Sequence, residues 1–584
     1  MSAGHGKGDA VGTGNALELR DLNVWFDPRD GRGDPVQVVE HLDLAVAPGE
    51  RVGLVGESGS GKTTTILAAM GLLPASASVA GSVLIDGEDA LSHGEASMRG
   101  HRWTDIAMVF QGAMSAFNPV KTIGWQLREA MEFHGVAKGR AALARTDELL
   151  ALVGLPDGTR QRFPHQLSGG MKQRAVIAMA LACDPKVLLA DEPTTALDVV
   201  VQDQILRLLV RLSEQLGLAL ILVTHDLGVV AQSCTRAAVM KDGRIVEDGP
   251  IEQLYRHPAH PYTRQLFDAT PDLFDVTQRE APVQSEALLE VRDLRVVYGQ
   301  KTRRRRAAAP AGAIDLSLSP SPMTATETIV TSPVDESDRV NGAAVDGVDL
   351  RVAEGELVAL VGQSGCGKTT TLQAVLGMVP VTSGSIRIDG TEVAELRPRQ
   401  WRPLRRDVQM IYQDPYEALD GRFRVRDAVM EPLIVHREGG RAERRERVAE
   451  ALRDVGLDPD LFGARFPHEL SGGQRQRVAI AASLVLRPHL LLADEPVSML
   501  DVSVRTGVLQ LLDRLRRTHR MGILMITHDL STAAAYADRI IVMRSGRIVE
   551  QGDPWTIVHR PAEEYTRRLL ESVPSPDPAR STAR

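Results

Sequence analysis

The chain has 584 residues, of which 43% are hydrophobic and 25% charged, and its formal net charge is −8. This length predicts several domains rather than one core, and the acidic balance gives no reason to expect nucleic acid as a partner. The three cysteines, Cys183, Cys234 and Cys366, lack the spacing of a disulfide framework or of a zinc or iron–sulfur site, which fits a reducing cytoplasm.

The N-terminal residues 1–16 are rich in glycine and are predicted to be disordered. They contain no apolar stretch of the kind that forms the centre of a signal peptide. No later run approaches the roughly 18 consecutive apolar residues of a membrane span. Any role at a membrane is therefore expected to depend on partner proteins.

The first predicted strand, LELRDLNVWF at 17–26, has a counterpart in LEVRDLRVVY at 289–298. Each strand ends in an aromatic residue, Phe26 or Tyr298. Such a residue could simply pack within the sheet. Beside a nucleotide site it could instead stack on adenine through its ring face. The pattern alone leaves both interpretations open.

A short apolar strand, a G-x-x-x-x-G-K-T loop and a helix follow, as GLVGESGSGKTTT at 53–65 and ALVGQSGCGKTTT at 359–371. This is a phosphate-binding loop in its required strand–loop–helix setting. Backbone N–H groups close around the phosphates, the lysine reaches the β- and γ-phosphates, and the first threonine hydroxyl can bind magnesium. The predicted nucleotide contacts are Gly56, Glu57, Ser58, Gly59, Ser60, Gly61, Lys62, Thr63 and Thr64, and Gly362, Gln363, Ser364, Gly365, Cys366, Gly367, Lys368, Thr369 and Thr370.

An apolar strand that ends in glutamine comes next in each half, IAMVFQ at 106–111 and VQMIYQ at 408–413. A single glutamine at the end of a strand is usually a solvated amide. The equal placement of Gln111 and Gln413 in the two halves favours a functional role instead.

The longest repeated stretch runs from 163 to 198 and again from 466 to 501. In each copy a Ser-Gly-Gly turn opens a helix, whose unpaired N–H groups suit an anion such as phosphate. The runs VLLADE at 187–192 and LLLADE at 490–495 are predicted as parallel strands buried on both faces. They deliver paired carboxylates to the edge where α/β sheets bind ligands, so that one acid can serve magnesium and the other a water.

Two further apolar strands, LALILVTHDL at 218–227 and MGILMITHDL at 521–530, each deliver a histidine. A histidine at a strand end is more often structural than catalytic. However, His225 and His528 follow their carboxylate pairs at the same interval, which indicates a shared role. A neutral imidazole there could bond the γ-phosphate and respond to its loss.

Together these motifs resemble the nucleotide-binding domains of ATP-binding cassette transporters, over nearly the whole chain from about Leu17 to Leu570. The resemblance implies two tandem P-loop ATPase domains of the α/β class that bind ATP and Mg²⁺. Each domain would have a mostly parallel sheet core, an antiparallel β subdomain and a helical signature subdomain. The signature motifs would be LSGGMKQR at 167–174 and LSGGQRQR at 470–477.

The resemblance also implies a role for each matching residue. Glu192 and Glu495 would be general bases, Gln111 and Gln413 Q-loop residues, His225 and His528 switch histidines, and Asp198 and Asp501 D-loop acids. Magnesium would be held by Thr63, Gln111 and Asp191 in one half and by Thr369, Gln413 and Asp494 in the other. Signature contacts to the nucleotide would come from Ser168, Gly169, Gly170, Ser471, Gly472 and Gly473, and adenine contacts from Phe26 and Tyr298. Met499 stands where the D-loop usually has alanine, which is a mild departure.

The segment after each switch histidine shows a more specific resemblance. HPAHPYTRQL at 257–266 is similar to the C-terminal motif of ATPase subunits of oligopeptide and dipeptide importers, and RPAEEYTRRL at 560–569 is a weaker copy. Separate subunits of that group often carry an iron–sulfur cysteine cluster after this motif. Because 267–288 and 571–584 contain no cysteine, no iron–sulfur cluster is expected. The chain resembles the fused subunits of glutathione or microcin-type peptide importers.

The resemblance implies an ATPase whose halves pair head to tail within the chain and drive uptake of a peptide-like solute. Its partners would be two integral-membrane permease subunits and an extracytoplasmic solute-binding protein, with no nucleic acid. It would lie peripherally at the cytoplasmic face of the inner or plasma membrane.

The alternative is a soluble tandem cassette protein acting on ribosomes or DNA. Zinc cysteines and a long charged linker, which mark that class, are missing, whereas the HPAHPYT motif is present.

The predicted domain boundaries follow from the two copies. They are a disordered N-terminus at 1–16, nucleotide-binding domains at 17–270 and 288–575, a linker at 271–287 and a disordered C-terminus at 576–584. The second half carries an insertion at 301–338 that is rich in Ser, Thr, Pro and Ala, and its composition predicts a disordered loop. Its four arginines could meet lipid headgroups or an acidic partner, but a solvated tether is favoured.

Overall fold

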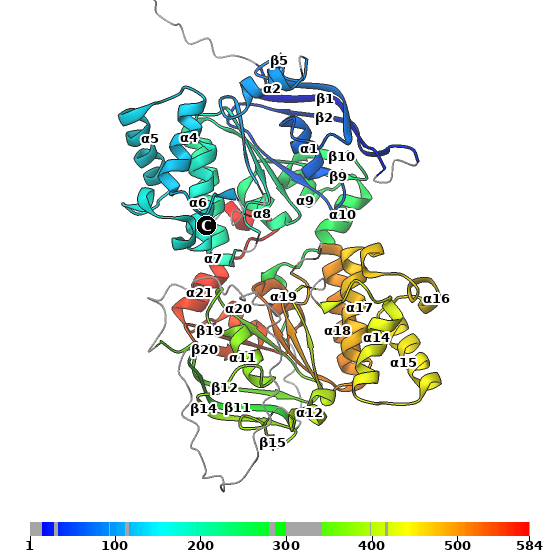
Figure 1. The fold of residues 1–584 in the computed structure, drawn as a ribbon. Helices are drawn as coiled ribbons and strands as arrows, with labels where there is room; N and C mark the ends of the chain where they lie inside the picture. The colour runs from blue at the N-terminus through cyan, green and yellow to red at the C-terminus, as the bar shows by residue number, and fades with distance from the viewer. Residues whose placement is uncertain are drawn as a thin grey trace, which may run out of the picture.

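The computed structural model describes residues 14–28, 33–92, 94–110, 112, 116–195, 197–278, 286–298, 342–397, 399–414, 418–498, 500 and 502–582. Within these ranges the chain forms two α/β lobes, drawn one above the other in Figure 1. The predicted site residues Gln111 and Asp501, together with Met499 and the 301–338 insertion, lie outside the described residues.

The first half opens with an antiparallel sheet in the order β2-β1-β4-β5. Leu17 of the central strand β1 pairs with Val46 on one side and with Ile85 on the other. Leu17 and Leu22 are fully buried, which confirms the predicted strand at 17–26. The strands are β1 (Leu17–Phe26), β2 (Val36–Val46), β4 (Ala77–Ile85) and β5 (Glu88–Asp89).

The core sheet of the first half has the order β10-β9-β3-β8-β7-β6. All its pairs are parallel except the edge pair of β10 and β9. Every residue of β7 and β8 is buried, as expected for strands covered on both faces. The strands are β3 (Arg51–Val55), β6 (Ile106–Val109), β7 (Val187–Asp191), β8 (Ala219–Thr224), β9 (Arg236–Lys241) and β10 (Arg244–Pro250).

The helices of the first half divide into those beside the core sheet and a helical subdomain of α4, α5 and α6 that projects to one side (Figure 1). They are α1 (Lys62–Ala69), α2 (Glu95–His101), α4 (Ile123–Phe133), α5 (Gly139–Leu152), α6 (Gly169–Ala180), α7 (Val199–Leu216), α8 (Leu227–Ser233), α9 (Ile251–Arg256) and α10 (Pro261–Asp268). Short 3₁₀ turns occur at η1 (Thr159–Gln161), η2 (Pro164–Gln166) and η3 (Leu273–Asp275).

The second half repeats both sheets, in the orders β12-β11-β14-β15 and β16-β17-β18-β13-β19-β20. Its strands are β11 (Ala287–Val296), β12 (Val345–Ala353), β13 (Leu357–Val361), β14 (Ser383–Ile388), β15 (Thr391–Glu392), β16 (Val408–Ile411), β17 (Leu490–Asp494), β18 (Gly522–Ile526), β19 (Arg539–Arg544) and β20 (Arg547–Gly552). Its helices are α11 (Lys368–Val375), α12 (Trp401–Asp407), α14 (Val425–Val435), α15 (Arg441–Asp454), α16 (Pro459–Phe462), α17 (Gly472–Leu484), α18 (Val502–His519), α19 (Leu530–Tyr536), α20 (Pro554–His559), α21 (Glu564–Glu571) and α22 (Pro578–Thr582), with a 3₁₀ turn at η6 (Pro467–Glu469). The predicted fold class is confirmed.

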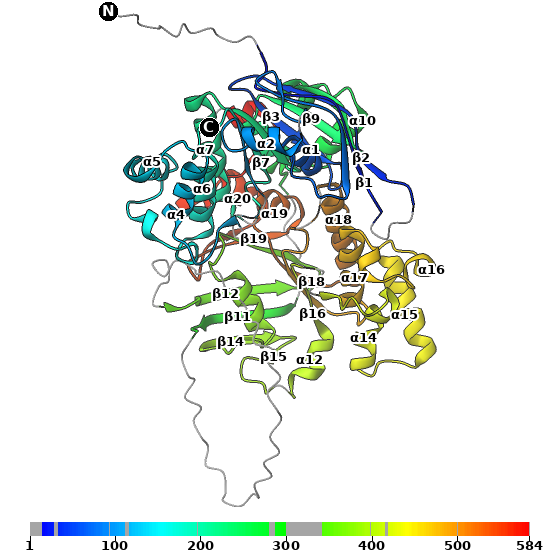
Figure 2. The same cartoon turned by 45° about the horizontal axis from the view of Figure 1, so that its top comes forward.

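The two helical subdomains project to opposite sides of the molecule, α4 to α6 on one side and α14 to α17 on the other (Figures 1 and 2). The corresponding subdomains of the two halves thus point in opposite directions. None of the helices in the described part of the chain is both long enough and apolar enough to cross a bilayer.

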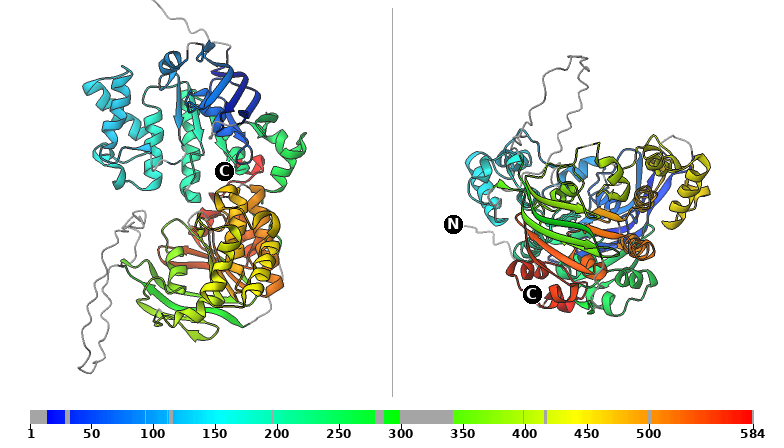
Figure 3. Two further views of the ribbon diagram at one scale, coloured as in Figure 1. Left: turned by 45° about the vertical axis from the view of Figure 1, so that its right-hand side comes forward. Right: turned by 90° about the horizontal axis from the view of Figure 1, so that it is seen from below.

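The C-terminal residues differ from the sequence prediction. The composition predicts disorder at 576–584, but 578–582 form α22, which contacts α8 and α9 of the first half. Figure 3 accordingly places the C-terminus against the first lobe. Pro576 and Pro578 are buried in this contact. The prediction was wrong here because the apolar surface that orders the segment belongs to the other half of the chain.

Candidate nucleotide-binding sites

Each phosphate loop connects a buried strand to a helix, β3 to α1 and β13 to α11. Gly56 and Gly362 have φ angles of +153° and +149°, and a Cβ on either would lie 2.2 Å from the carbonyl oxygen of Met240 or Met543. Only glycine fits these positions. The helices begin with a glycine N-cap, without a side-chain cap and without an acidic residue in the first turn. Their N-terminal N–H groups therefore suit a phosphate.

The phosphate-loop lysines are held inside their own loops. Lys62 is 7% exposed, and its Nζ donates to the carbonyl oxygens of Gly56 (2.7 Å) and Glu57 (2.8 Å). Lys368 repeats this arrangement with Gly362 (2.6 Å) and Gln363 (2.8 Å). An ammonium group beside an open helix N-terminus fits the β- and γ-phosphates of a nucleotide.

The threonine that follows each lysine lies beside the first acid of the carboxylate pair. The hydroxyl of Thr63 donates to Asp191 Oδ1 at 3.2 Å, and that of Thr369 to Asp494 Oδ1 at 3.5 Å. Burial raises the pKa of both aspartates to about 6. In the described residues no group of three or more His, Cys, Asp or Glu side chains could hold a metal. One hydroxyl and one carboxylate fit Mg²⁺, which usually takes its other ligands from phosphates and waters.

The second acid of each pair meets the predicted switch histidine. His225 Nδ1 lies 2.9 Å from Glu192 Oε1, and the Thr195 hydroxyl donates to Glu192 Oε2 at 2.9 Å. Glu192 has a φ of +42° and Glu495 one of +46°. Backbone strain of this kind in a residue other than glycine is concentrated at functional sites.

The second half has the same pair and adds the glutamine. His528 Nδ1 lies 3.2 Å from Glu495 Oε2, and Gln413 Nε2 donates to the same oxygen at 3.0 Å. The predicted Q-loop residue is thus brought to the predicted general base. Its role as a magnesium ligand stays a prediction.

The glutamates remain suited to accept a proton. Burial, the largest single effect, raises the pKa of Glu192 and Glu495. The hydrogen bonds and charge of the adjoining histidine, together with the phosphate-loop lysine and one further hydrogen bond from Thr195 or Gln413, outweigh it and leave both pKa values lowered. Conversely, burial alone would lower the pKa of His528, and Glu495 raises it. A positioned, ionised carboxylate of this kind can act as a general base toward a water.

The signature serines cap their helices. Ser168 Oγ accepts from Met171 N at 3.4 Å at the start of α6, and Ser471 Oγ accepts from Gln474 N at 3.3 Å at the start of α17. A Cβ on Gly170 would lie 2.6 Å from Val201 of α7. The second glycine therefore lets the signature helix pack closely on the helix that follows the D-loop. A Cβ on Gly473 would lie even closer to Val504 of α18, at 2.4 Å.

The two aromatic residues have different surroundings. Phe26 is partly buried and packs against the hydrophobic core of the first half. Tyr298 is 50% exposed, and its hydroxyl lies 3.2 Å from Thr370 Oγ1 on the phosphate-loop helix. Phe26 thus packs within the sheet, whereas Tyr298 lies beside the predicted nucleotide site. Stacking on adenine stays a prediction for both.

The first D-loop reaches the second half. Asp198 caps α7 by accepting from Val201 N at 3.0 Å. The next residue, Val199, is buried in the hydrophobic cluster of the second half, which also contains Tyr565. Burial raises the pKa of the Tyr565 hydroxyl, and the charge of Asp198 adds to this rise.

Sequence reasoning missed two residues at the phosphate loops. The hydroxyl of Tyr262 accepts a hydrogen bond from Glu57 N at 3.1 Å, and that of Tyr565 accepts one from Gln363 N at 3.1 Å. Both tyrosines belong to the repeated motifs at 257–266 and 560–569. Their equal position in two otherwise diverging copies was the signal that could have identified them.

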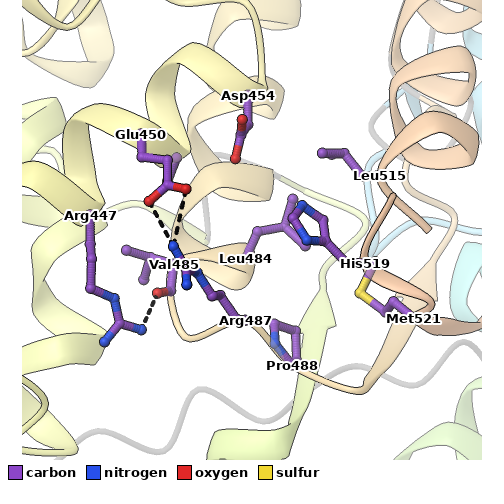
Figure 4. Close-up of a pocket in the computed structure, with 11 residues that line it drawn as sticks. Arg447, Glu450, Asp454, Leu484, Val485, Arg487, Pro488, Leu515, His519 and Met521 are labelled. Carbon is purple, nitrogen blue, oxygen red and sulfur yellow. Dashed lines mark hydrogen bonds and ion pairs between the residues drawn. The ribbon is translucent and has the colours of Figure 1, made fainter. Parts of the chain in front are cut away.

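None of these groups lines the small cavity of the second half that is drawn in Figure 4. Its volume is about 30 Å³ and its lining includes Arg447, Glu450 and Arg487. Arg487 pairs with Glu450 at 2.8 Å. The space holds about one water molecule, so it is a packing gap between the helical subdomain and α18 that is too small for a substrate.

Comparison with known proteins identifies the family to which the chain belongs. A family model described as ABC transporter matches residues 39–195 and 345–498. A second, described as oligopeptide/dipeptide transporter, C-terminal region, matches residues 246–293 and 549–584. Each half thus contains one copy of each.

Similar full-length proteins carry import or transport names. The chain is 40% identical over 578 residues to the glutathione import ATP-binding protein GsiA of Pectobacterium atrosepticum, covering 97% of this chain and 90% of that protein. It is 41% identical over 614 residues to the oligopeptide transport ATP-binding protein OppD of Mycobacterium tuberculosis, covering 97% and 99%. It is 41% identical over 567 residues to the peptidoglycan transport ATP-binding protein YejF of Agrobacterium fabrum, covering 95% and 96%. The chain therefore belongs to the ABC transporter family, as an ATPase with two fused ATP-binding domains, each followed by an oligopeptide/dipeptide transporter C-terminal region.

Proposed function

We propose that the chain is the ATP-hydrolysing subunit of an importer for peptides or a peptide-like solute, acting through separate membrane permease subunits and an extracytoplasmic solute-binding protein. The observation that carries the proposal is the oligopeptide/dipeptide transporter C-terminal region, which follows both ATPase domains. Relatives of about 40% identity over nearly the whole chain are named for glutathione, oligopeptide and peptidoglycan transport.

Each ATP would lie between the phosphate loop of one half and the signature helix of the other. Lys62 would then work with Ser471, and Lys368 with Ser168. The opposed helical subdomains (Figure 1) and the burial of Val199 in the second half support this head-to-tail pairing.

The site residues would promote ATP hydrolysis by positioning the reacting groups and stabilising their charge. Bound Mg²⁺-ATP supplies the phosphoryl group and neutralises part of its charge. The lysines and the helix N-termini would hold the phosphates, while Glu192 and Glu495 accept a proton from the attacking water. His225 and His528 hold these glutamates in place and would bond the γ-phosphate.

The permease would dock between the Q-loop and the helical subdomain of each half, at the cytoplasmic face of the membrane. Large apolar side chains are exposed there on both halves. In the first half they include Phe110 (44%), Val120 (73%) and Phe133 (75%), and in the second Tyr412 (45%), Phe423 (43%) and Ile434 (52%). Large apolar side chains exposed in the corresponding segments of both halves support a contact with another protein.

Copurification tests the function. The tagged chain would be isolated from the detergent-solubilised membranes of its own cells, and its associated proteins identified by mass spectrometry. The proposal predicts two integral-membrane proteins, and peptide uptake that is lost in the Glu192→Gln, Glu495→Gln variant. Sedimentation of the chain with ribosomes or DNA, in the absence of any membrane partner, would contradict the importer and support the soluble alternative.

A further inference from the structure

The segments that follow the two ATPase domains cross to the opposite half. We call residues 269–278 the first tail and residues 572–582 the second tail. Each tail follows one short helix, α10 or α21, which carries the tyrosine bonded to the phosphate loop.

At its near end, each segment is fixed to the phosphate loop of its own half. Tyr262 and Tyr565 are 5% and 8% exposed, and both hydroxyls accept a backbone N–H of the loop at 3.1 Å. A cation covers each ring, Lys241 Nζ at 4.9 Å from the centre of Tyr262 and the Arg544 guanidinium at 5.1 Å from that of Tyr565.

At its far end, the first tail packs on the second half. Its 3₁₀ turn η3 contacts α19 and α20. Leu273 is 2% exposed and belongs to the hydrophobic cluster of the second half. Thr506 of α18 donates to the carbonyl oxygen of Ala269 at 3.0 Å.

The second tail packs on the first half in the corresponding place. Its helix α22 contacts α8 and α9. A Cβ on Gly228 of α8 would lie 2.9 Å from the carbonyl oxygen of Pro574, so the tail lies directly on that helix. Both contacted helices, α8 and α19, begin two residues after the switch histidine of their half.

The two tails also bind each other. The carboxylate of Asp272 accepts from Ser575 Oγ at 3.2 Å and from Arg580 at 3.0 Å. The Asp272 side chain is 7% exposed, so this contact is largely shielded from solvent. The tails thus form one continuous connection between the halves.

We propose that the two C-terminal segments couple the ATP sites, each linking the phosphate loop of its own half to the switch-histidine helix of the other. A shift of the loop when nucleotide binds would move the tyrosine, its short helix and the tail as a unit. The tail would then reposition α8 or α19, and with it the adjoining histidine and glutamate. This inference rests on the proposed pairing of the halves but not on the transported solute.

An engineered disulfide tests whether each tail packs on the opposite half, which we call the tail exchange. This test does not depend on an activity assay. Asp272→Cys and Ser575→Cys are combined in a chain with a protease site placed within 279–285. After oxidation and cleavage, we expect the halves to stay joined on a non-reducing gel and to separate on reduction. Each single-cysteine variant is the matched control. Halves that separate without reductant, or a cross-link that joins two different chains, would overturn the exchange.

A double-mutant comparison tests the coupling. In a Glu495→Gln chain, ATP hydrolysis depends on the Glu192 site. The second tail packs on α8, the helix that follows His225 of this site. We expect Tyr565→Phe, which removes one hydrogen bond from the distant loop, to raise the KM for ATP of this site about 3- to 10-fold. In a chain that ends at Glu571, the same substitution is expected to change KM by less than about twofold. An equal effect with and without the tail would overturn the coupling.

A local variant covers the case in which the shortened chain does not fold. Gly228→Ala keeps the whole chain and places a methyl group against the carbonyl oxygen of Pro574. In the Glu495→Gln chain, Gly228→Ala should also reduce the rise in the KM for ATP that Tyr565→Phe causes at the Glu192 site. An unchanged rise would count against the coupling. If the disulfide forms but no permease copurifies, the tail exchange stands and only the importer proposal fails.

Discussion

The two halves of the chain have the same strand order in both sheets. They also share the lysine–carbonyl and histidine–glutamate contacts, but they differ in the surroundings of these groups. The histidine–glutamate distance is 2.9 Å in one half and 3.2 Å in the other. In contrast, Ser60 of the first phosphate loop is replaced by Cys366, and the first tail ends in a 3₁₀ turn where the second forms a helix. The comparison indicates two sites built for the same chemistry, with the differences placed in the connections around them.

The largest effect is expected at the general bases. Glu192→Gln and Glu495→Gln keep the side-chain shape but remove the proton acceptor, so the double variant should lose about 10²- to 10⁴-fold in ATP turnover. Equal losses in the two single variants would support equivalent sites. Binding of ATP, measured by equilibrium dialysis, should persist, and undiminished turnover in the double variant would refute the assignment.

The first tail should contribute to the stability of the second half. Leu273→Ala removes a buried side chain from the cluster of that half and should lower the free energy of unfolding by about 2–5 kcal/mol. Leu461→Ala is the matched control, because Leu461 is 54% exposed and should change stability by less than about 0.5 kcal/mol. Denaturant unfolding of the two variants measures both, and equal stabilities would mean that the tail does not pack as described.

A smaller effect is expected from making the phosphate loops alike. Lys368 lies 3.9 Å from Cys366 Sγ, but its main contacts are the carbonyl oxygens of Gly362 and Gln363. Cys366→Ser should therefore change the KM for ATP by only about twofold, since it exchanges one weak hydrogen bond for another. Steady-state ATPase assays check this, and a much larger change would show that the two loops are functionally distinct.

The smallest effect is expected from the insertion in the second half. Deleting 304–336 removes a segment whose composition predicts a surface loop with little buried area. ATPase and transport should stay near wild type. Loss of membrane recruitment in a flotation assay would instead identify the arginines of this segment as a contact site.

The sequence was most informative where the chemistry is local. The phosphate loop, the paired carboxylates and the histidine each depend on a short motif at the end of an apolar strand, and β7, β8 and β17 are found where those runs predict them. The repeated position of Tyr262 and Tyr565 could have marked them as candidates, but not their contacts, because Tyr262 and Glu57 are 205 residues apart and no local pattern links them. The C-terminal helix was missed for the same reason, since its partner helices α8 and α9 belong to the other half.

The central claim, that each ATP site is shared between the halves, is tested most directly by comparing pairs of substitutions. Lys62→Ala, Lys368→Ala, Ser168→Arg and Ser471→Arg would be measured singly and in pairs, in the chain purified with its permease. Residues that act as one unit are non-additive. We predict that Lys62→Ala with Ser471→Arg is little worse than the worse single variant, whereas Lys62→Ala with Ser168→Arg damages both sites and abolishes ATPase activity. Non-additivity in the second pair, within one half, would contradict the head-to-tail arrangement.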